Sequence, residues 1–167
     1  MRFFALQLLI SIALGVSSPS LVAASASAMQ HAQRFAVGGT GAAGVMSQGE
    51  HALRSVLAQQ DAAQRLESML PSASDAGRLY ILLGLRIRDR AAYQRALDLC
   101  SQHHTRVGTV RGCIVGDESF RSVVREIDRG GFDALMKRRW SSKYPSHAMQ
   151  TNGDPACRLL FTCLFPV

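Results

Sequence analysis

The feature that most constrains this chain is an apolar stretch near its centre. Residues 79–87 are apolar except for one glycine and one arginine. A helix that is apolar nearly all round has to be buried on every side, so we expect a central helix that begins at Ser74 or Asp75. Gly77 and Gly84 are seven residues apart and share a helical face, where their lack of a side chain would let another helix approach closely.

Four further segments show the helical spacing of apolar residues after a residue type that caps helices. The clearest start is a capping box formed by Ser47 and Glu50, in which each side chain satisfies a free backbone N–H group. The other three predicted helices begin at Asp61, Asp89 and Asp117. A short sixth helix is expected within residues 132–140.

Residues 105–115 break this pattern, because they are rich in β-branched residues and glycine and show no helical period. We expect a short hairpin or an extended connector there. The chain as a whole is predicted to be all-α, with five or six antiparallel helices. The segments that begin at Asp61 and Asp89 resemble each other, which suggests two helix pairs stacked side by side in a HEAT-like arrangement.

The N-terminus has the three-part composition of a cleavable secretory signal. Arg2 supplies positive charge, residues 3–16 form an apolar run, and small residues follow. Ala24 and Ala26 are the favoured cleavage positions, so residues 1–26 are assigned to the signal. A membrane-spanning helix needs about 20 apolar residues, and no later run reaches that length. We therefore expect export to the periplasm or the medium, with no transmembrane segment after cleavage.

Three segments are expected after the signal. Residues 27–46 are rich in glycine and alanine and are interpreted as a flexible lead-in, residues 47–140 as the helical domain, and residues 141–167 as an irregular segment that contains cysteines. Residues 39–44 match the spacing G-x-G-x-x-G of dinucleotide-binding loops. That motif needs a strand before it and a parallel sheet around it. Neither is predicted here, so we expect a linker and no cofactor.

The cysteines are even in number and lie in the C-terminal half of the chain, at Cys100, Cys113, Cys157 and Cys163. In an oxidising compartment they predict up to two disulfides, and Cys100–Cys113 with Cys157–Cys163 is one of three possible pairings. A zinc site is the less favoured interpretation. Cys100 and Cys113, together with His103 and His104, offer the thiolate and imidazole ligands that Zn²⁺ prefers, but exported cysteines usually oxidise first.

The formal net charge is +7, which favours acidic partners. Another protein or an acidic component of the cell envelope is expected, and nucleic acid is not, because the protein is predicted to leave the cytosol. The predicted contact patch is the basic and aromatic run Lys137, Arg138, Arg139 and Trp140. The alternative is a solvated helix end with Trp140 packed on the core.

No motif in the sequence identifies a catalytic group. A secretory signal, a small helical body and disulfides are typical of inhibitors and immunity-type proteins that block a toxin or a hydrolase. By analogy with that class, the sequence favours a non-enzymatic protein-binding module. Two alternatives stay open: a small exported hydrolase or metalloenzyme that uses the region from Cys100 to Glu118, and a secreted effector.

Overall fold

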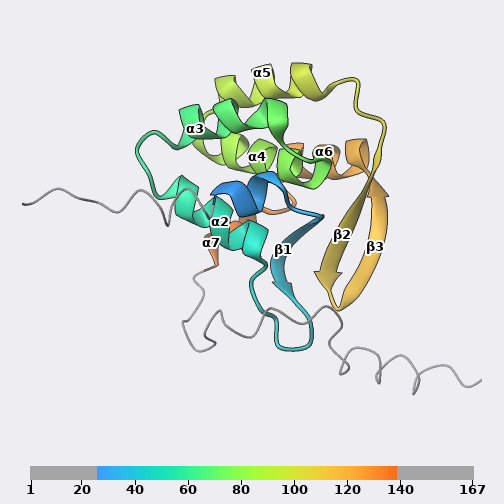
Figure 1. Cartoon of the computed structure of the whole chain (residues 1–167). Helices are drawn as coiled ribbons and strands as arrows, with labels where there is room; N and C mark the ends of the chain where they lie inside the picture. The colour runs from blue at the N-terminus through green and yellow to red at the C-terminus, as the bar shows by residue number, and fades with distance from the viewer. Residues whose placement is uncertain (1–25, 139–167) are drawn as a thin grey trace, which may run out of the picture.

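The computed structural model of the chain describes residues 26–138 (Figure 1). The predicted signal, apart from residue 26, and residues 139–167 lie outside this range. After a helical turn through residues 26–30, the elements are β1 (Arg34–Thr40), α2 (Gln48–Leu57), α3 (Ala62–Met69), the 3-10 helix η1 (Leu70–Ser72), α4 (Asp75–Arg88), α5 (Arg90–Cys100), β2 (Arg106–Gly112), β3 (Ile114–Ser119), α6 (Phe120–Asp128) and α7 (Asp133–Lys137). No helix in the described range is long and apolar enough to cross a membrane.

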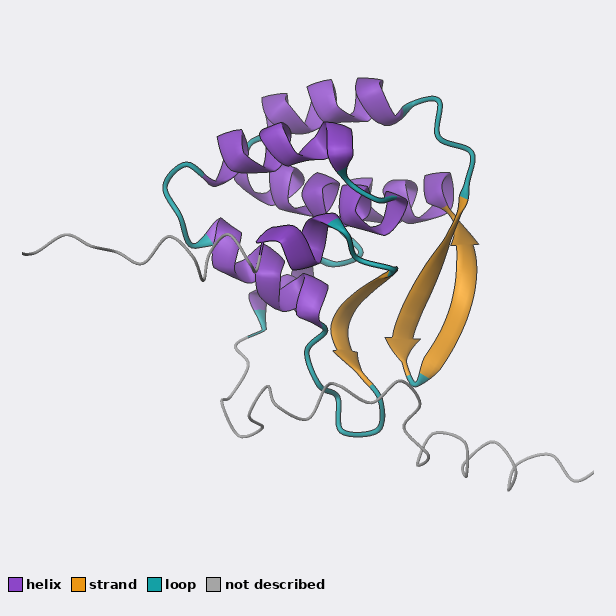
Figure 2. Cartoon of the chain, viewed as in Figure 1, coloured by secondary structure: helices purple, strands orange, loops and turns teal. Residues whose placement is uncertain are grey.

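The three strands form one mixed sheet in the order β1-β2-β3, so the all-α prediction was wrong. β1 runs parallel to β2, with Arg34 paired with Gly108. β2 runs antiparallel to β3, with Val110 opposite Val115. The strands lie side by side on one side of the molecule and the helices gather on the other (Figure 2). This is a mixed α/β architecture, not a HEAT-like stack of helix pairs.

The first strand comes from the segment that had been expected to be a flexible lead-in. Phe35, Ala36 and Val37 are all buried in β1. This apolar run of three is too short to stand out beside the glycines that follow it. The glycines do not make the segment a linker either, because Gly38 has a φ of 97° and a side chain there would collide with Leu135 of α7.

The hairpin expected within residues 105–115 is present but longer, since β3 continues to Ser119. Asp117 therefore lies in a strand and does not begin a helix. α6 begins at Phe120, and the Ser119 hydroxyl caps it by accepting a hydrogen bond from the N–H of Ser122 at 3.2 Å. Both residue types cap helices well, so the sequence alone did not distinguish these two starting points.

The predicted central helix is confirmed as α4, which contacts α2, α3, α5, α6 and the strands β1 and β2. Its side chains from Leu79 to Leu83 are fully buried. Ser74 caps it by accepting a hydrogen bond from the N–H of Gly77. At Gly84, the missing side chain leaves room for Leu53 of α2 and Leu66 of α3, as the predicted small-residue face required.

The outer edge of β1 is closed by side chains instead of by another strand. The Tyr80 hydroxyl of α4 lies 2.8 Å from the amide nitrogen of Ala36 and 2.9 Å from its carbonyl oxygen. The Ser47 hydroxyl donates to the same carbonyl at 2.7 Å. The N–H of Gly38 donates to the Glu50 carboxylate at 2.9 Å. The N–H and carbonyl of Ala36 and the N–H of Gly38, which β1 turns away from β2, are therefore satisfied.

Candidate functional site

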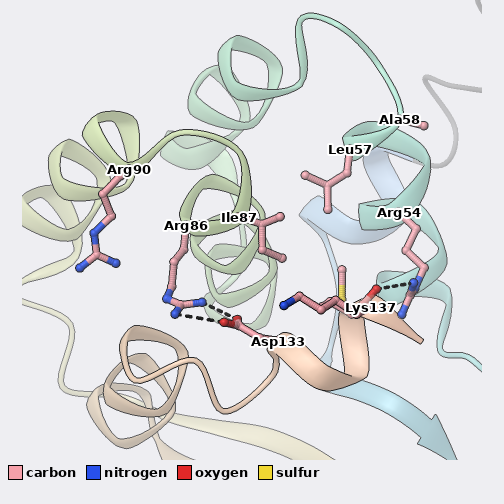
Figure 3. A pocket seen from close by; sticks show the side chains of 9 residues that line it. Arg54, Leu57, Ala58, Arg86, Ile87, Arg90, Asp133 and Lys137 are labelled. Atoms are coloured by element: carbon pink, nitrogen blue, oxygen red, sulfur yellow. Dashed lines mark hydrogen bonds and ion pairs between the residues drawn. The ribbon is translucent and has the colours of Figure 1, made fainter. Parts of the chain in front are cut away.

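One candidate site is a surface groove of about 580 Å³ between the C-terminal ends of α2 and α4 and the short helix α7 (Figure 3). Its cations come from different helices and are Arg54, Arg86, Arg90 and Lys137. A single carboxylate, that of Asp133, lines it beside them. Its apolar part is made of Leu57, Ala58, Ile87 and Met136. The groove therefore combines an apolar surface with an excess of positive charge.

Helix α7, which carries one wall of the groove, buries none of its own residues and is clamped at both ends by arginines. At its N-terminal end, the Arg86 guanidinium bonds both carboxylate oxygens of Asp133 and donates to the carbonyl of Asp128. At its C-terminal end, Arg54 donates to the carbonyls of Leu135, Met136 and Arg138. The last carbonyls of a helix lack the usual backbone partner one turn later, so the Arg54 guanidinium serves as a cap, together with the N–H of Arg138, which donates to the Leu135 carbonyl.

Arg54 is itself fixed by Glu50, one turn earlier on α2. The Glu50 carboxylate is 0% exposed and accepts from Nε and Nη2 of Arg54 at 3.0 and 2.8 Å. Its second oxygen accepts the N–H of Gly38 in β1. One buried carboxylate thus ties the sheet edge to the arginine that caps α7, and this fixes the position from which Lys137 enters the groove.

The four groove cations differ in how much of their charge is already compensated. Arg54 and Arg86 are saturated by the contacts just described. Arg90 is more than half exposed, meets Asp128 only at 3.3 Å, and stacks on the ring of Tyr93 at 5.1 Å from its centroid. Lys137 makes no ion pair or hydrogen bond within residues 26–138 and points into the groove (Figure 3). Lys137 and Arg90 are therefore the cations available to a ligand.

The predicted contact patch is only partly within the described range. Lys137 and Arg138 are exposed there, and Arg139 and Trp140 lie outside it. Sequence reasoning missed the groove arginines, which come from distant parts of the chain. One signal was present: Arg86 is the only charged residue in the apolar core of the central helix, and such a residue needs a partner.

The predicted Cys100–Cys113 disulfide was wrong, because no disulfide is found within residues 26–138. Cys100 ends α5, while Cys113 lies in the turn between β2 and β3. Strand β2 lies between the two cysteines in the chain, and its seven residues span about 20 Å at about 3.3 Å per residue. Cys100 is buried and forms no disulfide within residues 26–138, and burial raises the pKa of its thiol. Cys157 and Cys163 lie outside the described residues.

The residues of the less favoured zinc site, among them His103 and His104, contact different helices. His103 lies against Asp75 and Arg78 of α4, with Nδ1 at 3.5 Å from the Asp75 carboxylate. His104 contacts Arg121 of α6 through Nε2 at 3.2 Å. Within residues 26–138, no group of three histidine, cysteine or acidic side chains is placed to hold a metal ion.

Residues 39–44 run from the end of strand β1, which the sequence did not predict, toward helix α2, which it did. Its backbone groups are nevertheless used within the protein. Thr40 and Val45 exchange two backbone hydrogen bonds, and the N–H of Gly41 donates to the carbonyl of Gly112 at 3.0 Å. The N–H of Gly44 donates back to Gly41. A phosphate-binding loop needs such N–H groups directed at its ligand, so this loop is better described as a tight connection.

Two side chains in the region from Cys100 to Glu118, those of Cys100 and Glu118 themselves, lie in structural surroundings. A nucleophilic cysteine has to be deprotonated and accessible, whereas Cys100 is buried with a raised pKa. The Glu118 carboxylate is held by Arg111 at 2.8 Å and by the Thr109 hydroxyl at 2.9 Å. The bond from Arg111 is the main reason that the pKa of Glu118 is lowered. These contacts describe a structural ion pair, not a general base.

No known protein family, curated protein or solved structure matches this chain.

Proposed function

We propose that this chain is an exported, non-enzymatic binding protein whose groove takes an acidic segment of another protein. The observation that carries the proposal is Lys137, a cation without a described counter-charge beside the apolar side chains Leu57, Ile87 and Met136. A glutamate or aspartate next to an apolar side chain complements both features. The clamps from Arg54 and Arg86 hold this wall in place before binding, which lowers the entropic cost of association.

The four cations of the groove have two different roles, and this makes the proposal specific. Arg54 and Arg86 serve the fold of α7, so their replacement would disturb the groove itself. Lys137 and Arg90 contribute little to the fold and would contact the partner directly. Complementary charges of this kind increase the association rate and the selectivity for acidic partners more than the raw affinity.

The test uses a short fluorescein-labelled peptide in which glutamates flank a central leucine, titrated against the full chain by fluorescence anisotropy. Replacing Lys137 by Ala should weaken binding about fivefold, the effect of one partly exposed charge pair, and Arg90→Ala should act in the same direction. The matched control is Arg65→Ala, which removes one positive charge from an exposed ion pair with Asp61 on α3, outside the groove. Equal effects of Lys137→Ala and Arg65→Ala would reject the groove as the site.

Export is the second part of the proposal, and the core supports a cleavage position before residue 27. Met29 is fully buried, and the carbonyl of Ser27 accepts the N–H of His31 at 3.0 Å. Cleavage after Ala28 would place a charged amino group on the buried Met29. Cleavage after Ala24 or Ala26 keeps Met29 within the chain and keeps the hydrogen bond between Ser27 and His31. The intact mass of the protein from its native compartment tests this. A mass that retains residues 1–24 would contradict export through a cleaved signal.

A further inference from the structure

Within residues 26–138, no strand pairs with the outer edge of the sheet, which is formed by β3, and one of its outward backbone groups, the Asp117 carbonyl, accepts a hydrogen bond from the Arg106 side chain. Within the described residues, the order of the strands places β3 beside β2 alone. Ile114 and Val115 are 68% and 57% exposed, although both are β-branched and apolar. Because adjacent residues of a strand point to opposite faces, both faces of the edge carry exposed apolar surface.

This edge differs from the other edge of the same sheet. At β1, the side chains of Tyr80, Ser47 and Glu50 satisfy outward backbone groups of Ala36 and Gly38. β3 contains no proline and no bulge in its pairing with β2, which are two of the usual devices that prevent an edge from pairing with another chain. It carries two charged residues, Asp117 and Glu118, and Glu118 is paired with Arg111. One edge is thus closed by the fold, and the other is left available for pairing.

Charge along β3 indicates which kind of strand would pair with it. The Asp117 carboxylate makes no ion pair within residues 26–138, and Arg106 contacts only the backbone carbonyl of Asp117. In an antiparallel pairing of β3 with a second copy over the whole strand, the Asp117 carboxylates of both copies would lie near the two-fold axis. Like charges brought together across strands are destabilising, so a second copy is disfavoured.

We propose that β3 binds an extended segment of another protein as an additional antiparallel strand, with a basic residue opposite Asp117 and apolar residues opposite Val115 and Ile114. The backbone hydrogen bonds of the added strand would supply affinity, and these three side-chain pairs would supply selectivity. The surface is separate from the groove at α7, so this inference does not depend on the proposed function of the groove.

The experiment titrates the isotope-labelled full chain with a synthetic peptide, flanked by threonines, that places one arginine opposite Asp117 and two valines opposite Val115 and Ile114. Amide shifts in the NMR spectrum are expected to concentrate in residues 114–119. A peptide of the same sequence, N-methylated at the backbone nitrogens that face β3, should not bind. Replacing its arginine by glutamate should weaken binding about fivefold, as expected for a facing charge pair.

The variant Asp117→Arg provides the decisive comparison, since an exposed residue near the end of a strand can be changed without loss of the fold. It should prefer the glutamate peptide to the arginine peptide. Unchanged binding of the N-methylated peptide, or shifts outside β3, would overturn the proposal. Dimerisation of the full chain in sedimentation, abolished by replacing Val115 with Lys, would also overturn it, because the edge would then be occupied by a second copy.

Discussion

The Tyr80 hydroxyl accepts the N–H of Ala36 at 2.8 Å and donates to the carbonyl of the same residue at 2.9 Å. One side chain of the central helix thus makes both of the backbone contacts that a neighbouring strand would make with Ala36. Its ring packs on Phe35 at 4.8 Å between centroids. The edge of β1 is in this way joined to α4, and through Glu50 and Arg54 to the groove.

Replacing Tyr80 by Phe should lower the free energy of unfolding by about 2 kcal/mol, because the N–H of Ala36 loses its hydrogen bond to the hydroxyl and the Ala36 carbonyl keeps only that from Ser47. The matched control is Tyr93→Phe. Tyr93 is also fully buried, but its hydroxyl has no hydrogen-bond partner within residues 26–138. Its removal should leave the stability unchanged or increase it. Urea unfolding measures both variants, and equal losses would show that the Tyr80 contacts do not close the edge.

The Glu50–Arg54 pair should behave as a coupled unit. Glu50→Ala is expected to cost about 3 kcal/mol, since it leaves the partly buried Arg54 guanidinium without its counter-charge. The double variant Glu50→Ala with Arg54→Ala should cost less than the sum of the single changes. A double-mutant cycle in urea tests this. Additive effects would mean that the two residues do not act together in holding α7.

The pH dependence of stability should reflect the two buried tyrosines. Burial is the main cause that raises the pKa of Tyr80 to about 12 from the ordinary 10.0, and that of Tyr93 to about 12 as well, with a smaller contribution from the nearby Asp128 carboxylate. The folded protein therefore keeps these protons when the unfolded chain loses them. The contribution of these two tyrosines to the free energy of unfolding should be constant below pH 10 and fall between pH 10 and 12.

Urea titrations at a series of alkaline pH values check this expectation. The fall should be smaller in Tyr80→Phe and smallest when Tyr93 is changed to Phe as well. A fall of the same size in the double variant would assign the alkaline loss to other groups.

Cys100 should be a thiol in the protein purified from its native compartment. Alkylation in denaturant without a reductant should label Cys100, and peptide mapping reads the label. In the folded protein the reaction should be slow, because the thiol is buried and its pKa is raised. Labelling that occurs only after reduction would instead show that Cys100 is in a disulfide.

The sequence predicted the helices better than the strands for a physical reason. Helix caps and apolar spacing are local signals, and Ser47, Ser74 and Asp89 all cap helices where expected. Strand β1 is defined by a partner, β2, about 70 residues away in the sequence, and by side chains of α2 and α4. An apolar run of only three residues, from Phe35 to Val37, does not predict such a partner strand, whereas the glycines beside it are typical of a linker.

The groove could not be predicted from the sequence for the same reason, because its residues are far apart in the chain. Lys137 could be predicted as a contact residue, because it lies in a basic run beside the only tryptophan of the chain. Arg54 and Arg86 are separated from it by many residues and became part of the site only through their contacts with α7. The disulfide prediction failed because a count of cysteines carries no information on the strand that separates Cys100 from Cys113.

The most direct test of the account is a charge reversal in the groove. The variant Lys137→Glu should lose binding of the glutamate-flanked peptide and gain binding of the same peptide with lysines in place of glutamates, as measured by fluorescence anisotropy at low salt. The wild-type protein should show the opposite preference, and Arg65→Glu should behave as wild type. If Lys137→Glu keeps the wild-type preference, the groove does not select an acidic partner, and the central claim is wrong.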